Sequence, residues 1–268
     1  MKILILTPLT HFYSPLVLRT LFSELAGKEF EIHAILTPKI SSKKRSSSSL
    51  RSIIRNSGLR YLLLMMATNL KYDLLRLGEA VTRCPLPCRR FLTPPDACAA
   101  FGVPAMVFPN VNGRDCVEAV RSLAPDLILC VFFNQILKTE LLGCAKEFCL
   151  NLHPSLLPAY KGMTPILWML AEGAETGGVT IHRLTDELDA GAIIAQEAFP
   201  ITPSDSVFTT YSKAAAIGGH LLARLLLNWR NRPAETPQPR EAGKIYGPIT
   251  REAVSRIAAR HSFLRFRK

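Results

Sequence analysis

The sequence predicts an α/β fold in which helices cover a doubly wound, mostly parallel sheet. Strand-length apolar runs alternate with helical patterns along most of the chain, and the chain opens strand, helix, strand. Hydrophobic residues make up 48% of the 268 residues, which is ample for a buried core. We expect residues 1–228 to form one domain and residues 229–268 to form a basic tail that wraps it.

The opening elements are expected at Lys2–Thr7, Ser14–Gly27 and Glu31–Thr37. In the helix, Leu18, Leu21 and Leu25 recur at helical spacing. A strand-helix-strand opening indicates two parallel strands joined by a right-handed crossover. The first turn has no Gly-x-Gly-x-x-Gly motif, so nothing in it signals a nicotinamide or flavin dinucleotide.

Residues 40–95 interrupt the alternation as a basic helical insertion. From Lys39 to Leu92 there are twelve Lys or Arg against two acids, which contributes +10 to a formal net charge of +12. A polar basic loop is expected over 41–49, followed by a helical hairpin packed on the domain. The alternative is a basic amphipathic helix, within residues 55–77, that lies on a membrane surface or a partner. The apolar positions are Leu59, Leu62, Leu63, Met66, Leu70, Leu74 and Leu77.

The alternation then resumes, and neighbouring strands of such a sheet gather their carboxyl ends into a crevice. Strands are expected at Ala105–Phe108, Asp126–Phe133, Phe148–His153, Gly178–Arg183 and Ala192–Phe199. Helices are expected at Asp115–Leu123, Thr139–Lys146, Pro165–Gly173 and Ser206–Trp229.

The cysteines argue against a disulfide-bonded or zinc-binding protein, and the apolar runs argue against a membrane-spanning one. The seven cysteines are odd in number and scattered, which is typical of free thiols in a reducing cytoplasm. Cys84 and Cys88 have no second Cys/His pair nearby, so no metal site is expected. The N-terminal residues do not resemble a signal peptide, and no apolar run approaches the roughly 18 residues of a spanning helix.

A polar pair stands at the end of the strand Phe148–His153. Asn151 and His153 are two residues apart, so both side chains project from one face at the carboxyl end of that strand. Asp189 lies in the loop between the last two strands, and the fold can return it to the same edge. A carboxylate orients and charges an imidazole, and an amide can donate to an oxyanion. Each residue could instead be structural: a satisfied strand histidine, or a turn aspartate before Ala190 and Gly191.

The motifs around these residues resemble the folate-dependent formyltransferases. The stretch from Asn151 reads N-L-H-P-S-L-L-P-A-Y-K-G, and G-V-T-I-H and L-D-A-G-A-I-I-A-Q follow it. The family includes glycinamide ribonucleotide transformylase, methionyl-tRNA formyltransferase, sugar N-formyltransferases and formyltetrahydrofolate hydrolase. The similarity runs from about Ala124 to Ala215, so the resemblance implies a formyltransferase-like, Rossmann-related catalytic domain.

The resemblance implies a role for each residue of the pair and for the aspartate. An amine attacks the formyl carbon of the co-substrate 10-formyltetrahydrofolate, and Asn151 with protonated His153 stabilises the tetrahedral oxyanion. Asp189 keeps His153 charged and, through water, assists removal of the amine's proton. His182 matches the transformylase and hydrolase members, although a strand histidine can be merely structural.

The resemblance also implies a slot for the pterin ring. One wall comes from the end of the strand before the histidine strand, where backbone groups and apolar side chains can hold a flat ring. The other comes from the loop before the aspartate. The predicted slot residues are Phe133, Asn134, Gln135, Ile136, Leu137, Asp186 and Glu187.

The acceptor amine is less well determined by the sequence. Lys161 stands where tRNA-modifying members commonly have arginine, and the chain ends too early for the C-terminal barrel domain of methionyl-tRNA formyltransferase. We therefore expect a small amine or a nucleotide-linked amino sugar, whose phosphates the basic insertion could contact. The alternatives are the initiator tRNA, water (as in the hydrolase), and a non-catalytic basic module that binds membrane or nucleic acid. The oligomeric state is left open.

Overall fold

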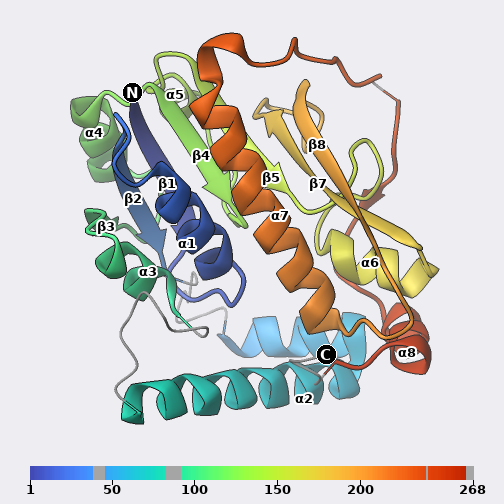
Figure 1. Ribbon diagram of the computed structural model, residues 1–268. Helices are drawn as coiled ribbons and strands as arrows, with labels where there is room; N and C mark the ends of the chain where they lie inside the picture. The colour runs from blue at the N-terminus through green and yellow to red at the C-terminus, as the bar shows by residue number, and fades with distance from the viewer. Residues whose placement is uncertain (39–45, 83–91, 240, 264–268) are drawn as a thin grey trace.

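The computed structural model describes residues 1–38, 46–82, 92–239 and 241–263. A seven-stranded sheet runs through the molecule in the order β3-β2-β1-β4-β5-β7-β8 (Figure 1). The strands β1 to β5 are parallel, and β7 and β8 continue the sheet as an antiparallel pair. The strands are β1 Lys2–Pro8, β2 Glu31–Thr37, β3 Ala105–Val107, β4 Leu127–Val131, β5 Phe148–His153, β7 Thr176–Arg183 and β8 Ile193–Pro200.

The helices cover both faces of the sheet because the strands are apolar on both sides. Ile3 and Ile5 of β1 face the core that contains α1 and α7, while Leu4 and Leu6 face the core that contains α4 and α5. The predicted mostly parallel α/β fold is therefore confirmed. The helices are α1 Ser14–Leu25, α3 Pro94–Ala100, α4 Arg114–Leu123, α5 Thr139–Leu142, α6 Pro165–Glu172 and α7 Val207–Leu227.

Two predicted elements end earlier than the sequence indicated. The strand predicted to reach Phe133 ends at Val131, because Phe132 takes a left-handed backbone with a φ of 49°. The helix predicted to reach Lys146 ends at Leu142, where Gly143 follows and the Gly143 N–H closes the turn on Thr139 O. The first correction shortens a strand at the carboxyl edge of the sheet, and the second shortens the helix that precedes β5.

Beyond α7 the chain does more than wrap the surface. A 3-10 helix, Trp229–Asn231, is followed by the short strand β9 Ile245–Tyr246, which pairs with β6 Lys161–Gly162. The last helix, α8 Arg251–Arg260, packs its apolar side into the larger core beside α6. The segment predicted as a tail is thus tied to the residues that follow β5.

The insertion contains α2, Ser46–Val81, in which the chain turns at Gly58 (φ 87°, ψ 160°). Residues 46–57 and 59–81 are therefore two helical segments, as expected of a helical hairpin, and they run past the carboxyl ends of the parallel strands (Figure 1). The apolar positions named from the sequence do not form the packing face of α2. Six of the seven predicted positions, all but Leu62, are exposed, and the opposite side carries the packing residues Tyr61, Leu64, Tyr72 and Leu75.

Some predictions fall outside the described residues. Residues 41–45 of the predicted basic loop belong to this group, as do Cys84 and Cys88. The other five cysteines are free thiols, four of them buried. No helix in the described ranges is both long and apolar enough to cross a membrane.

Candidate active site

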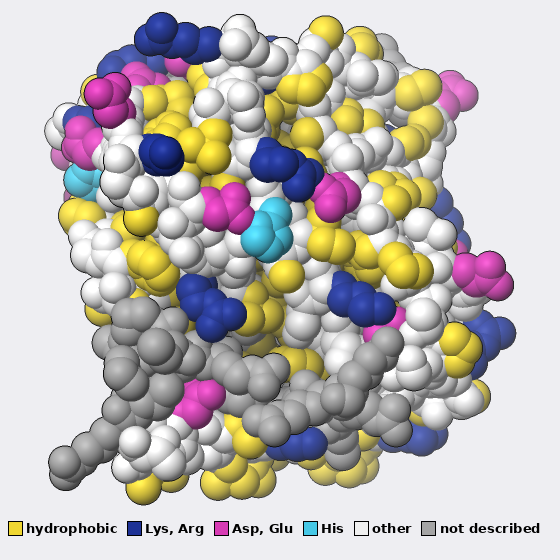
Figure 2. All heavy atoms as spheres, in the orientation of Figure 1, with side chains coloured by type: hydrophobic (Ala, Val, Ile, Leu, Met, Phe, Trp, Pro, Cys, Tyr) yellow, Lys and Arg dark blue, Asp and Glu magenta, His cyan; other side chains and the backbone are white. Residues whose placement is uncertain are grey.

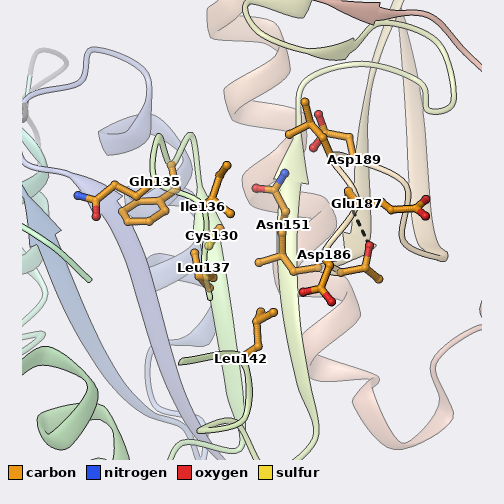
Figure 3. A pocket seen from close by; sticks show the side chains of 13 residues that line it. Cys130, Gln135, Ile136, Leu137, Leu142, Asn151, Asp186, Glu187 and Asp189 are labelled. Carbon is orange, nitrogen blue, oxygen red and sulfur yellow. Dashed lines mark hydrogen bonds between the residues drawn. The ribbon is translucent and has the colours of Figure 1, made fainter. Parts of the chain in front are cut away.

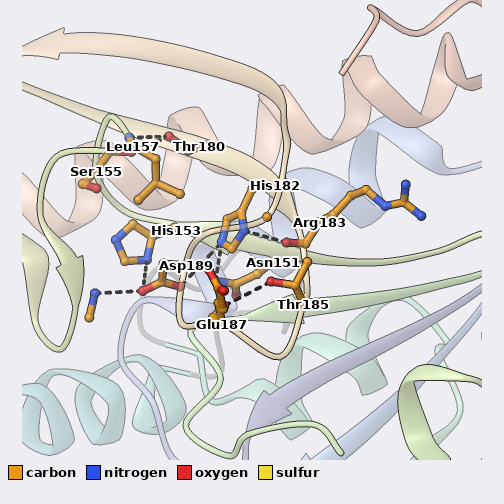
Figure 4. Close-up of polar contacts among 12 residues, drawn as sticks. Asn151, His153, Ser155, Leu157, Thr180, His182, Arg183, Thr185, Glu187 and Asp189 are labelled. Atoms are coloured by element: carbon orange, nitrogen blue, oxygen red, sulfur yellow. Dashed lines mark hydrogen bonds and ion pairs between the residues drawn. The ribbon is translucent and has the colours of Figure 1, made fainter. Parts of the chain in front are cut away.

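Strand pairing brings four polar side chains onto one face of the sheet. In the antiparallel pair of β5 and β7, His182 lies opposite Asn151 and Thr180 lies opposite His153. Residues directly opposite each other in such a pair share a face, so all four side chains point to the same side (Figure 4).

The aspartate returns to this face from the loop between β7 and β8. One carboxylate oxygen of Asp189, Oδ2, lies 3.6 Å from Nδ1 of His153, and the other, Oδ1, lies 3.6 Å from Nε2 of His182. Asp189 is only 8% exposed. The structure therefore brings the three predicted residues together and adds His182 as a second imidazole on the same carboxylate.

The hydrogen bonds of His153 determine which ring nitrogen carries a proton. Its Nε2 lies 3.0 Å from the carbonyl oxygen of Tyr160, and a carbonyl can only accept, so Nε2–H is the donor. The Nδ1 atom then faces the Asp189 carboxylate. A proton gained at Nδ1 would lie directly against that carboxylate.

His182 takes the opposite tautomer. Its Nδ1 donates to the carbonyl oxygen of Arg183 at 2.8 Å, so Nε2 accepts from the amide Nδ2 of Asn151 at 3.1 Å. Burial, followed by the neighbouring His153, lowers the pKa of His182 to about 4. A neutral His182 therefore orients the Asn151 amide by accepting one of its two N–H groups. The second N–H is not used by His182.

The loop that carries Asp189 is held by residues far away in the sequence. The N–H of Gly162 donates to Asp189 Oδ2 at 2.8 Å, and Gln238 Nε2 donates to the carbonyl oxygens of Asp189 and Gly191 at 3.0 and 2.7 Å. Asp189 itself has a left-handed φ of 49°. A Cβ at Gly191 would lie 2.0 Å from the carbonyl oxygen of Arg183, so only glycine fits there.

A second polar cluster fixes the turn after β5. The hydroxyl of Thr180 donates to the carbonyl oxygen of Ser155 at 2.7 Å and accepts from the N–H of Leu157 at 3.0 Å. Gln196 of β8 donates to the same hydroxyl and to the carbonyl oxygen of Leu157, both at 2.8 Å. The carbonyl that contacts His153 thus lies in a segment braced by two neighbouring strands.

A cavity opens beside Asn151 and Asp189, between the end of β4 and the loop 184–189 (Figure 3). We call it the sheet-edge cavity; it holds about 610 Å³ of space, part of it open to solvent. Six of the seven predicted slot residues line it, while Asn134 and His153 are not among the lining residues. The lining residues are Cys130, Phe133, Gln135, Ile136, Leu137, Leu142, Asn151, Leu184, Thr185, Asp186, Glu187, Leu188 and Asp189.

The polar groups on the β4 side of this cavity are already engaged by the protein. The Gln135 side chain turns away from the cavity, accepts from the N–H of Val111 at 3.1 Å and donates to the carbonyl oxygen of Pro109 at 3.0 Å (Figure 3). Asn112 donates to the carbonyl oxygen of Ile136 at 2.8 Å. This wall is therefore mainly apolar, and the loop 184–189 supplies most of the polar lining.

Cys130 also lines the cavity, and Cys149 lies on the neighbouring strand. Burial raises the pKa of the Cys130 thiol well above its ordinary value, and it raises the pKa of Cys149 to about 12. Both thiols are therefore protonated at neutral pH and are poor nucleophiles. Among the described residues no group of three or more His, Cys, Asp or Glu side chains could hold a metal ion.

The loop after β1 adds aromatic residues at the same edge of the sheet. The ring of His11 stacks on Phe132, with centroids 4.8 Å apart, and its Nδ1 accepts from the N–H of Ser14 at 3.0 Å at the start of α1. The stacking was not predictable, because it depends on the left-handed turn at Phe132.

Comparisons with known proteins find similarity to formyltransferases. Residues 107–226 match the family described as formyl transferase. A methionyl-tRNA formyltransferase from Lysinibacillus sphaericus is 37% identical over 151 residues, which cover 55% of this chain and 48% of that protein. The chain thus spans about half the length of that relative.

Two solved structures share the fold. Phosphoribosylglycinamide formyltransferase from Anaplasma phagocytophilum aligns with a TM-score of 0.59 and 18% identity, over 92% of this chain and 99% of that one. An N-formyltransferase from Helicobacter canadensis aligns with a TM-score of 0.58 and 14% identity, over 92% and 71% of the two chains. The predicted resemblance to formyltransferases is confirmed.

Proposed function

We propose that this chain, whose residues 107–226 match the formyl transferase family, transfers a formyl group from 10-formyltetrahydrofolate to a primary amine. The acceptor we favour is a small amine or a nucleotide-linked amino sugar. The observation that carries the proposal is the placement of Asn151 and Asp189 on the wall of the sheet-edge cavity, with His153 paired to Asp189 immediately behind it.

The donor fits the sheet-edge cavity by shape and chemistry. A flat pterin ring needs apolar walls and a polar edge, and the cavity offers Phe133, Ile136 and Leu137 on one side. The loop 184–189 would meet the polar edge of the ring with its backbone and side-chain groups. The Helicobacter canadensis relative was solved with folinic acid, a formylated reduced folate, which supports this choice of donor.

The reaction begins when the lone pair of the amine attacks the formyl carbon. A C–N bond forms, and the carbonyl oxygen becomes an oxyanion that the Asn151 amide and a protonated His153 would stabilise. The amine proton leaves with help from Asp189, the oxyanion re-forms the carbonyl, and the bond from the formyl carbon to the donor nitrogen breaks as that nitrogen takes up a proton. Tetrahydrofolate and a formamide are the products.

The choice of acceptor rests on two observations. The Helicobacter canadensis structure contains dTDP-3-aminofucose, a nucleotide-linked amino sugar. In this chain α2 carries five Lys or Arg against two acids, and it runs at the same edge of the sheet as the site (Figure 1). Positive charge at that edge would attract the phosphates of such an acceptor.

A screen of amine acceptors with 10-formyltetrahydrofolate would test the proposal. We expect tetrahydrofolate release that depends on an added amine and a product heavier by one formyl group. Formate release without any amine would instead indicate a hydrolase. Failure to bind a reduced folate in calorimetry would contradict the donor assignment.

The sequence relative supports a second candidate, formylation of the initiator methionyl-tRNA. That relative is named a methionyl-tRNA formyltransferase, and the basic segment could contact the nucleic-acid backbone. Nanomolar affinity for the charged initiator tRNA, with formyl transfer to its methionine, would favour this function. Micromolar, sequence-independent binding that disappears at moderate salt would favour the amino-sugar acceptor.

A further inference from the structure

A continuous apolar row lies on the outer side of α2. Its members are 55% to 73% exposed, although leucine, methionine and valine are ordinarily turned inward. They follow one another at steps of four, three, four, four, three and four residues, which keeps them on one side of the helix. The outer row consists of Leu59, Leu63, Met66, Leu70, Leu74, Leu77 and Val81.

The outer row is not the face by which α2 packs on its own domain. The opposite side of the same helix already packs on the larger core through Tyr61, Leu64, Tyr72 and Leu75. The Tyr72 hydroxyl donates to the carbonyl oxygen of Leu92, and its ring lies 4.5 Å from that of Phe12. The helix is therefore held in place by one apolar face and presents a second one.

Exposed basic residues accompany the outer row. Arg51, Arg55, Arg60 and Lys71 are exposed on α2, and Asp73 is partly neutralised by Arg76 at 3.7 Å. In Figure 2 hydrophobic side chains reach the lower rim of the molecule, where α2 runs in Figure 1, with Lys and Arg beside them. This pairing of apolar and basic side chains is complementary to an anionic apolar partner.

The spacing of the outer row favours a flat partner. The steps repeat after eleven residues, from Leu59 to Leu70 and from Leu70 to Val81, which is 3.67 residues per turn. Such a row runs almost straight along an ordinary helix for about 33 Å. A left-handed pair of helices needs a seven-residue repeat instead, and a second copy would bring two net-positive α2 helices together, each with five Lys or Arg against two acids.

We propose that residues 59–81 dock on the surface of an anionic lipid bilayer, with the outer row in the boundary between headgroups and acyl chains. The helix lies along the surface, since none of the described helices can cross a membrane. The basic residues of α2 then meet anionic headgroups. This interaction is independent of the proposed formyl transfer and holds for any acceptor.

Co-sedimentation of the full chain with vesicles tests the docking. The vesicles contain phosphatidylcholine alone or with about one-third phosphatidylglycerol, the range in which basic segments respond to surface charge. We expect binding to the anionic vesicles, weakening as salt is raised, and at least tenfold weaker binding of a Leu63→Gln/Leu70→Gln/Leu77→Gln variant. A matched control, Val107→Gln/Leu227→Gln, removes exposed apolar side chains elsewhere and should bind like the parent.

Three outcomes would overturn the docking proposal. The first is unchanged binding of the triple variant, provided that its circular dichroism melt shows a folded protein. The second is equal binding to vesicles with and without phosphatidylglycerol. The third is a parent chain that does not bind vesicles but forms a dimer in sedimentation velocity, when the triple variant stays monomeric. A second copy would then cover the outer row.

Discussion

The candidate active site and helix α2 lie at the same edge of the sheet and are built in opposite ways. At the site, His153, His182 and Asp189 are almost fully buried, and each has partners at defined distances within the chain. On α2, large apolar side chains remain exposed while the other face is packed. The site residues are thus held in fixed positions by contacts within the chain. The outer row, by contrast, is free to contact a partner outside the domain.

The largest effect in this comparison is expected from removing the imidazole at the site. His153→Ala should lower the turnover number for formyl transfer by roughly 10²- to 10⁴-fold, because oxyanion stabilisation and proton transfer are both lost. Asp189→Asn should also reduce turnover, because it leaves the imidazolium without its carboxylate. Turnover is measured as amine-dependent tetrahydrofolate release.

The matched control for that experiment is His33→Ala on β2, a histidine of the same sheet that bonds Glu31 at 2.9 Å instead. It should keep normal turnover. Near-normal activity of a folded His153→Ala or Asp189→Asn protein would refute the assigned roles.

Two glycines should respond in opposite directions. Gly191→Ala should lower the free energy of unfolding by roughly 1–3 kcal/mol or more, because its Cβ meets the backbone of Arg183. Gly78→Ala on α2 meets nothing within 4 Å and should raise helix stability by about 0.5–1 kcal/mol. Urea denaturation of both variants measures the difference, and equal midpoints would contradict the rigid description of the Asp189 loop.

His182 should make the stability of the protein depend on pH. Its pKa is about 4 in the folded protein against an ordinary 6.5, so the unfolded chain binds the proton first as the pH falls. Stability is therefore complete above pH 6.5 and declines between pH 6.5 and 4. From pH 7 to pH 5 the loss should be roughly 2 kcal/mol.

Denaturation of the parent and of His182→Gln at both pH values isolates this contribution. Asp205, whose pKa is lowered to about 2, does not interfere, because its stabilising effect disappears only below pH 4. A variant as sensitive to pH as the parent between pH 7 and 5 would contradict the buried neutral imidazole.

The smallest effect is expected on the outer row. Leu70→Gln should change the free energy of unfolding by less than about 0.5 kcal/mol, because the side chain is already exposed. Leu152→Ala, in the core beside the site, should cost about 2–5 kcal/mol in the same measurement. A large loss for Leu70→Gln would mean that the outer row packs within the protein.

The three predicted site residues lie close together for a physical reason. Strand alternation places Asn151 and His153 on one face, and the short connection to β8 allows Asp189 to return to it. Gln238 and Gly162 could not be found in this way. They contact the Asp189 loop from segments that are far away in the sequence and show no regular pattern. A single Gln or Gly in such a segment does not indicate which residue it will contact.

The packing face of α2 could not be predicted from the sequence because both faces of the helix are apolar. The row at Leu59, Leu63 and Leu70 and the row at Leu64 and Leu75 each have helical spacing. Periodicity alone therefore cannot say which row turns inward. Aromatic contacts decide it, since Tyr72 meets Phe12 in the loop after β1.

The thiol of Cys130 could affect whether a formyl group reaches the amine or is lost to a side reaction. A thiolate in the sheet-edge cavity would compete with the amine for an activated acyl carbon and would trap it as a thioester. Burial keeps this sulfur protonated at neutral pH, so the competing acylation is suppressed without removing the cysteine. The same apolar surroundings that suit a flat ring thus also protect the enzyme from modifying itself.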